Sequence, residues 1–250
     1  DQTGTTFRDV LTEIAAAGRA TPRHDGTKWG VVIDRPSADA LIVDHVNPMN
    51  SWGFRWTRTY LNPPDAFVVT FPDADNDYKE TQRTIPWPGH AGDIELTEEL
   101  SLPGKVHAAE VWREARRRQL ETVHRPDSYQ ATQEGAPRVA TRGDNVMLSH
   151  YVLSRVQMVA RVISVSGTLV ALSNLVEMED GTEYALRFRV FANETDTVGT
   201  SVTRRVRAVA GETDVLILTE AGDPPGAGDI VHFGPVGVES YQQIVRNVKS

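Results

Sequence analysis

The sequence predicts an α+β protein with two domains: an N-terminal α/β sheet domain with flanking helices, followed by an all-β, barrel-like domain. Apolar residues follow helical spacing near residues 5–18 and 105–124. Beyond Pro126, short alternating segments separated by turn residues follow one another to the end of the chain. A chain of 250 residues has room for two domains, so we place the boundary at about residue 127, between 1–127 and 128–250.

The first helix is predicted by one apolar stripe and by residues suited to its two ends. Thr5 or Thr6 can cap the free amides of the first turn, and Gly18 can supply a left-handed residue at the end. The stripe consists of Phe7, Val10, Leu11, Ile14 and Ala15.

Several strands are expected after this helix. Residues 28–34 alternate and stop before Pro36, and a second short strand begins at 40–43. Residues 66–71 are apolar almost throughout, which predicts a strand near the centre of a sheet, whereas 78–85 is polar and alternating, as in an edge strand.

Aromatic residues alternate with polar ones over residues 52–60. Trp52, Phe54 and Trp56 share one face, and we interpret this face as buried core, because a half-buried strand has a period of two. The alternative is an exposed aromatic platform, with Trp87 as a further member, that binds a carbohydrate or a protein.

The second helix, over 105–124, lies between Pro103-Gly104 and Pro126. Glu179-Asp180-Gly181 predicts a hairpin turn that joins strands over 169–178 and 182–191. The strands expected there lie near 127–133, 145–150, 155–165, 168–178, 182–191, 201–210, 214–219, 229–233 and 241–248.

Composition excludes several functions. The chain has no cysteine, which rules out disulfides, Cys-ligated zinc, iron–sulfur clusters and thiol nucleophiles. It has no apolar run long enough for a membrane span. Its net charge of −8 disfavours a dedicated nucleic-acid binder. The first residue is Asp1 and no secretory signal pattern is seen, so we expect a segment of a longer protein.

Motifs for metal or phosphate binding are incomplete. Asp73, Asp75 and Asp77 are similar to the start of a calcium loop, but Tyr78 and Thr84 stand where that loop needs Gly and Glu, so a solvated acidic turn is expected. The histidines lack metal-ligand spacing and the glycines lack phosphate-loop spacing. The histidines are His24, His45, His90, His107, His124, His150 and His232; the glycines, interpreted as turn residues, are Gly226, Gly228, Gly234 and Gly237.

Charged clusters are also interpreted as structural. The pairs Glu98-Glu99 and Glu177/Glu179 have the residue type for acid–base catalysis, but no further feature singles them out. A basic cluster on the second helix is expected to be a solvated face near Glu110 and Glu114. Its members are Arg113, Arg116, Arg117 and Arg118.

No serine lies in a G-x-S-x-G elbow, although a triad from distant residues stays open. We predict no catalytic, cofactor-binding or metal residues and no cofactor.

Four ordered motifs resemble the tail-tip hub proteins of long-tailed bacteriophages, the host-specificity or tip attachment proteins of the lambda J type. Residues 64–71, an apolar strand, run into the turn Asp75-Asn76-Asp77-Tyr78-Lys79, and the helix 108–116 follows. Two "G-D-x-V" turns come later, at 143–146 and 228–231. The resemblance extends from about residue 7 to about residue 248.

The resemblance implies a structural protein of the virion, made in the host cytoplasm, and not an enzyme. Such hubs are homotrimers that close the distal end of the tail tube, in contact with distal tail and tape-measure proteins. DNA passes through them without specific binding, and regions outside this segment contact the host. We therefore expect acidic residues of the β domain to face the lumen, namely Glu177, Glu179, Asp180 and Glu183. The alternatives are a cell-wall-degrading enzyme and a carbohydrate-binding module of the tail tip.

Overall fold

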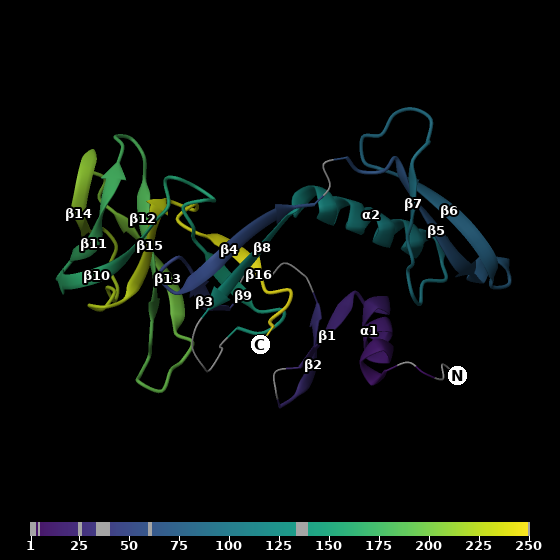
Figure 1. The fold of residues 1–250 in the computed structure, drawn as a ribbon, viewed down its shortest axis with the longest axis horizontal. Coiled ribbons are helices and arrows are strands. Elements are labelled where there is room, and N and C mark those ends of the chain that lie inside the picture. Colours follow the sequence, from purple (N-terminus) through teal and green to yellow (C-terminus); the bar gives the residue numbers. More distant parts are fainter. Residues whose placement is uncertain are drawn as a thin grey trace. The chain divides into compact units, whose positions relative to one another are not determined.

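The computed structural model describes residues 4, 6–24, 27–33, 41–59, 62–133 and 140–249, and the chain forms two compact units (Figure 1). Unit 1 comprises 1–35 and 54–131; unit 2 comprises 36–53 and 132–250. The passage at 131/132 lies close to the expected boundary at 127. However, the prediction that residues 36–53 belong to the N-terminal domain is wrong. They belong to unit 2, because their strand pairs with a strand at 145–148.

Unit 1 contains both helices of the described residues. The elements that lie in it wholly or mostly are α1 (Phe7–Ala17), β1 (Ala20–His24), β2 (Trp29–Ile33), β4 (Ser51–Arg58), β5 (Ala66–Asp73), the 3-10 turn η1 (Ala74–Asn76), β6 (Lys79–Pro86), β7 (Thr97–Glu99), α2 (Ala108–His124) and β8 (Asp127–Gln133). They form the sheets β1-β2, β4-β8 and β6-β5-β7.

Helix α1 begins where the sequence predicts and ends differently. Thr6 is the N-cap: its hydroxyl accepts the Asp9 amide, and the Asp9 carboxylate accepts the Thr6 amide, which completes a capping box. The expectation of a left-handed Gly18 was wrong, since its φ is −92°. The next residue, Arg19, takes the left-handed conformation with φ 58°. Its side chain forms an ion pair with Glu114 at 2.6 Å.

The sheet of β5, β6 and β7 holds the core of unit 1. Strand β5 is central and β6 is an edge, as their apolar and polar patterns predict. Helix α2 covers this sheet with the fully buried Val111 and Ala115, and Gln119 donates from Nε2 to the Ile85 carbonyl at 3.0 Å. The helix starts at Ala108, not at residue 105, because the Val106 carbonyl accepts the amide of Ala74 instead of a helical amide.

Unit 2 consists of strands in its described part. They are β3 (Ile42–Val46), β9 (Asn145–Leu148), β10 (Met158–Ser166), β11 (Leu169–Met178), β12 (Tyr184–Val190), β13 (Thr200–Val206), β14 (Gly211–Ile217), β15 (Ile230–Pro235) and β16 (Tyr241–Ile244). Six of them form one antiparallel sheet in the order β13-β12-β15-β10-β11-β14. The other three form the sheet β16-β9-β3, in which β3 and β9 are parallel.

The six-stranded sheet curls but does not close into the expected barrel. Its edge strands β13 and β14 meet through a single bridge, Val206 to Leu218. Strand β14 pairs with β11 on its other side. The predicted hairpin of β11 with β12 is wrong, because β11 pairs with β10 and β14, whereas β12 pairs with β13 and β15. Register shifts in β10 and β11 interrupt their ladders, and bulges of this kind bend the strands that carry them. The β character of the domain is therefore confirmed, and the closed barrel is not.

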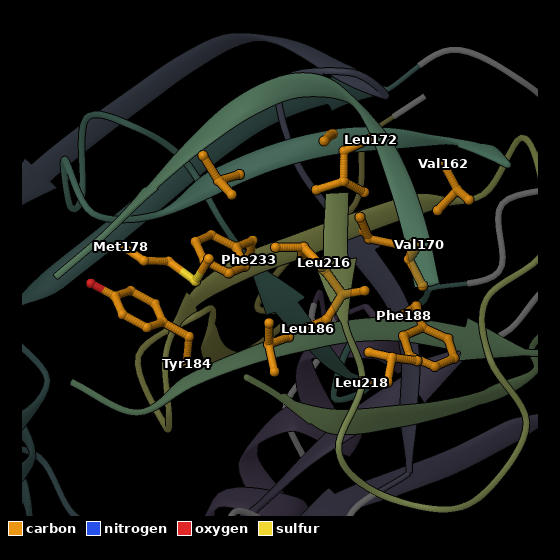
Figure 2. Packing of buried hydrophobic residues seen from close by; sticks show 14 residues of the cluster. Val162, Val170, Leu172, Met178, Tyr184, Leu186, Phe188, Leu216, Leu218 and Phe233 are labelled. Atoms are coloured by element: carbon orange, nitrogen blue, oxygen red, sulfur yellow. The ribbon is translucent and has the colours of Figure 1, made fainter. Parts of the chain in front are cut away.

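The inner face of this sheet carries one apolar cluster (Figure 2). Within this cluster the rings of Tyr184 and Phe233 stack, with centroids 5.3 Å apart. Leu186 lies opposite Phe233 in the register of β12 and β15, and both are buried. Figure 2 shows these side chains converging from several strands on a shared interior, which is the main source of stability of unit 2.

The two "G-D-x-V" turns are built in the same way. Asp144 accepts the Thr141 amide and Asp229 accepts the Gly226 amide, each from three residues earlier. Gly143 and Asp144 bond both backbone groups of Val245, and Gly228 and Asp229 bond those of Val162 in the same pattern. The turns open β9 and β15, as predicted. Gly234, however, lies within β15 and is not a turn residue; a Cβ there would meet Glu239 Cα at 3.0 Å.

Replacement of the central aromatic residue tests this account of the core. We expect Phe233→Ala to lower the free energy of unfolding of unit 2 by about 3–5 kcal/mol, because it removes a large buried ring and leaves a cavity. Urea denaturation followed by circular dichroism measures the change. The control is Val209→Ala, at an exposed position, with an expected change of about 0.5 kcal/mol or less. Equal effects of the two substitutions would contradict the assignment.

Candidate functional site

A buried polar cluster on unit 2 is the best candidate for chemistry. In the register of β12 and β15, the pair next to Leu186 and Phe233 is Arg187 and His232. Because side chains alternate along strands, this second pair lies on the face opposite the apolar core. Strand β3 supplies His45 to the same cluster. The centroid of the His45 ring lies 5.1 Å from that of the His232 ring. Both histidines are buried.

Hydrogen bonds hold each member of the cluster. His45 Nε2 lies 2.8 Å from Ser201 Oγ, and His232 Nε2 lies 3.2 Å from Asn47 Nδ2. Arg187 forms an ion pair with Glu239 at 2.7 Å, and the Glu239 side chain is buried. The Arg187 guanidinium also donates to Ser201 at 3.3 Å.

Burial keeps both histidines neutral. Desolvation, followed by the charges of nearby groups, lowers the pKa of His45 to about 2. The same causes, desolvation first and Arg187 second, lower the pKa of His232 to about 3. Burial also lowers the pKa of His150, which stacks on Tyr151 outside this cluster.

The pair of His45 and Ser201 has the distance of a general base and a nucleophile, but not the chemistry. A catalytic base works best with a pKa near the working pH, and the pKa of His45 lies far below it. In the described part of the chain, His45 Nδ1 has no hydrogen-bond partner, so no carboxylate orients this ring. Through these contacts the cluster attaches β3 to β13 and β15.

The arginines of α2 converge on one carboxylate. Glu114 is buried, and Arg117 bonds it at 3.0 Å, with Arg118 at 3.8 Å and Arg19 at 2.6 Å. Burial raises the pKa of Glu114. The hydrogen bond and charge of Arg117, together with the charges of Arg19 and Arg118, outweigh this effect, so the pKa of Glu114 lies below its usual range. Two of the four predicted arginines are thus occupied by an internal partner.

The other two arginines of the cluster also contact unit 1. Arg116 lies over the Trp112 ring at 5.4 Å, and Arg113 donates to the Ala109 carbonyl. The expected solvated face is wrong for Glu114, because helical periodicity cannot show that Arg19 arrives from another element.

The remaining acidic candidates lie on other elements. Asp73 accepts the Asp75 amide and caps η1, so the predicted acidic turn joins β5 to β6. Asp77 adopts the left-handed conformation in that turn. Glu98 and Glu99 are exposed on β7. Glu177 is exposed on β11, and Glu179 is exposed just after it.

The predicted burial of the β4 aromatics was wrong. Trp52 and Trp56 are 50% and 51% exposed, and Phe54 is half-buried against Tyr129, with centroids 6.1 Å apart. Trp87 is instead a core residue. Alternation predicts that a strand has two different faces, but it does not show whether another layer covers either face. In the described residues, β4 pairs with β8 alone.

Polar groups rim this exposed strand. Trp56 Nε1 donates to Asp127 at 2.9 Å, and Arg58 forms an ion pair with the same carboxylate at 3.0 Å. The Arg58 hydrogen bond is the main cause that lowers the pKa of Asp127. The result is an aromatic and charged surface on β4, with Asp127 of β8.

A second apolar surface covers α1 and β2. The predicted helical stripe exists, but α1 has no buried residue. Between the helix and the hairpin lies an open hollow of about 240 Å³, lined by Leu11, Pro22, Trp29, Gly30 and Val31. The large apolar residues of this surface that are at least half exposed are Phe7, Ile14, Trp29, Val31 and Ile33.

Comparison with known proteins assigns no family. A scan of protein-family models and a search of the curated proteins both find no match. Within the described ranges, neither helix has the length and apolar character needed to cross a bilayer. The same residues contain no group of three or more His, Asp or Glu side chains arranged to hold a metal ion.

Removal of the buried carboxylate tests the arginine cluster. We expect Glu114→Ala to destabilise unit 1 by about 1–3 kcal/mol, because it leaves three guanidinium groups close together without their shared partner. The control is Glu110→Ala on the same helix, whose contact with Lys105 is 4.0 Å long and more exposed, with an expected cost of about 0.5 kcal/mol. Urea unfolding of both variants decides, and similar costs would show that Glu114 has no special role.

Proposed function

We propose that this chain is a structural component of a bacteriophage tail tip. It forms part of the hub at the distal end of the tail tube, assembles there as a homotrimer, and links the tube to the host-recognition region. It acts by assembly and not by catalysis. The observation that carries the proposal is the apolar surface that the described residues leave open, in one patch on α1 and β2 and in another on β4.

This surface favours assembly for a physical reason. Two-stranded sheets are marginally stable alone, and both β1-β2 and β4-β8 have only two strands in the described chain. Soluble monomers rarely leave contiguous apolar patches of large area exposed. Partner subunits that cover these strands would supply the missing layer.

The order of motifs supports the choice of this family. The strand β5, the acidic turn, the helix α2 and the two Gly-Asp turns occur in the order of the hub proteins that the sequence resembles. The equivalent hydrogen bonds of the Gly143-Asp144 and Gly228-Asp229 turns support the interpretation of these as one repeated device.

The partners of the proposed hub are other copies of this chain, the distal tail protein and the tape-measure protein. The protein is made in the host cytoplasm and resides in the virion, and DNA passes without specific binding. The net charge of −8 supports this, because it weakens contact with phosphates. We propose that Glu177, Glu179, Asp180 and Glu183 face the lumen; all four are exposed, and Glu183 pairs with Arg205 at 3.0 Å.

Self-association is the first test. Sedimentation velocity at micromolar concentration should show a trimer, and Val31→Asp should weaken the association at least about tenfold, because it puts a charge on an apolar interface. Val209→Asp, at an exposed position of unit 2, is the matched control and should have little effect. A monomer at every concentration, or equal effects of the two substitutions, would argue against the assembly.

Location in the particle is the second test. An antibody against this chain, visualised by electron microscopy on phage particles, should label the distal end of the tail. Label along the tube, on the capsid or on no particle contradicts the proposal.

One observation favours a second candidate, a carbohydrate-binding module. Exposed Trp52 and Trp56 have apolar ring faces on which a sugar can stack, next to the polar groups of Arg58 and Asp127. If this candidate is correct, Trp56→Ala should reduce binding to host surface polysaccharide at least about tenfold, the loss of one aromatic anchor. Trp112→Ala, on α2, is the control. Under the hub proposal the chain shows no such binding.

A further inference from the structure

We propose that His232 and His45 form an acid-sensitive latch that holds the β3 segment on the six-stranded sheet of unit 2. The segment concerned, 36–53, is the part of the chain that enters unit 2 before the chain returns to unit 1 at Phe54. This inference does not depend on the proposed function.

The geometry around Asn47 requires an unprotonated His232 nitrogen. The Asn47 side-chain oxygen accepts the Met49 amide at 3.0 Å, and its nitrogen donates to the His45 carbonyl at 3.2 Å. These two bonds fix the orientation of the amide, so that Nδ2 is also the atom facing His232 Nε2. A donor faces this ring nitrogen, which must therefore carry a lone pair. A proton there would place two donors face to face.

A protonated imidazole carries a donor on both ring nitrogens, and in the described part of the chain neither ring has an acceptor at both positions. Among the described residues, His45 Nδ1 and His232 Nδ1 are buried and have no hydrogen-bond partner. Water would solvate such a proton, but both side chains are almost fully buried. The charged rings can be accommodated only if the contact between β3 and the sheet opens.

Charges around the cluster add to the effect. Arg187 on β12 faces both rings and Arg189 on the same strand faces His45, so a histidinium meets positive charge. Each arginine already has a carboxylate: Glu239 follows β15 and pairs with Arg187, and Asp44 on β3 pairs with Arg189 at 3.4 Å. The neighbouring strands β13 and β9 place uncharged residues beside His45: the Ser201 hydroxyl on β13 contacts its ring, and Met147 on β9 is its register partner.

Opening of the latch would release a connected set of bonds at the end of β3. Asn50 donates to the His45 carbonyl at 2.6 Å, and the Ser51 hydroxyl donates to the Asn47 carbonyl at 2.6 Å. These bonds depend on the position of Asn47, which His232 holds. A change at one ring nitrogen thus reaches residues 45–51.

The sign of the pH dependence follows from which state binds protons. Both rings are neutral when the latch is closed, and both regain an ordinary pKa near 6.5 when it opens. The latch is therefore fully stable above about pH 6.5 and weakens as the pH falls. Below that value, each ring raises the open population about tenfold per pH unit, and the two together about a hundredfold.

Hydrogen exchange of the whole chain tests the latch between pH 7 and pH 5, above the usual range of carboxylates. After correction for the intrinsic exchange rate, the amides of 42–50 should open at least about tenfold more often at pH 5, while β11 amides change less. The variant His45→Gln/His232→Gln should lose this dependence. His107→Gln, at an exposed position on unit 1, should keep it.

A second measurement needs no variant. Ring proton chemical shifts of the folded protein should show His45 and His232 still neutral at pH 5. Titration of either ring near pH 6.5 without opening of β3, equal acceleration of β3 and β11, or an unchanged pH dependence in the double variant would each overturn the proposal.

Discussion

Unit 2 depends on the burial of one face of its six-stranded sheet. The stack of Tyr184 on Phe233 and the neighbouring Leu186 align β12 with β15, and this alignment fixes what appears on the opposite face. Arg187 and His232 are placed there by the same register, because Arg187 follows Leu186 on β12 and His232 precedes Phe233 on β15. The apolar core thus determines where the polar cluster can form, and the cluster in turn determines where β3 attaches.

Local chemistry made much of the fold predictable. The capping box of α1, the central position of β5 and the start of β9 and β15 after Gly-Asp turns each depend on residues close together in the sequence. The wrong predictions concern contacts between residues that lie far apart in the sequence. Arg19 takes the left-handed position that Gly18 was expected to take, and its side chain binds Glu114 from a distant helix. The alternation of Trp52 and Trp56 was interpreted correctly as a strand, but which layer covers a strand is a tertiary property.

The polar cluster of unit 2 could not have been predicted, for the same reason. His45, Ser201 and His232 lie far apart in the sequence, and no spacing rule connects them. Their type gave no signal either, because an isolated histidine more often lies at a surface. Two residues did carry a clue: Asn47 and Asn50 follow an apolar strand, where amide side chains commonly organise the next turn.

The two units differ in how completely they bury their own elements. Unit 2 wraps its largest sheet around a single core. Unit 1 has a smaller core under α2, and its two-stranded sheets stay open. If the proposed assembly is correct, unit 1 offers the surface that neighbours cover, while unit 2 keeps its shape alone.

The insertion of 36–53 into unit 2 also sets an order of events during synthesis. Strand β3 leaves the ribosome long before β9, its parallel partner, and such a distant pairing is slow to form because a long loop must close. The pairing of β4 with β8 shortens that search. Residues 53 and 132 are the two points at which the segment 54–131 interrupts unit 2. A Cβ on Gly53 would lie 3.7 Å from Thr132 Oγ1, so these two points are close together in the folded chain. Pairing of β4 with β8 therefore shortens the loop that must close when β3 pairs with β9.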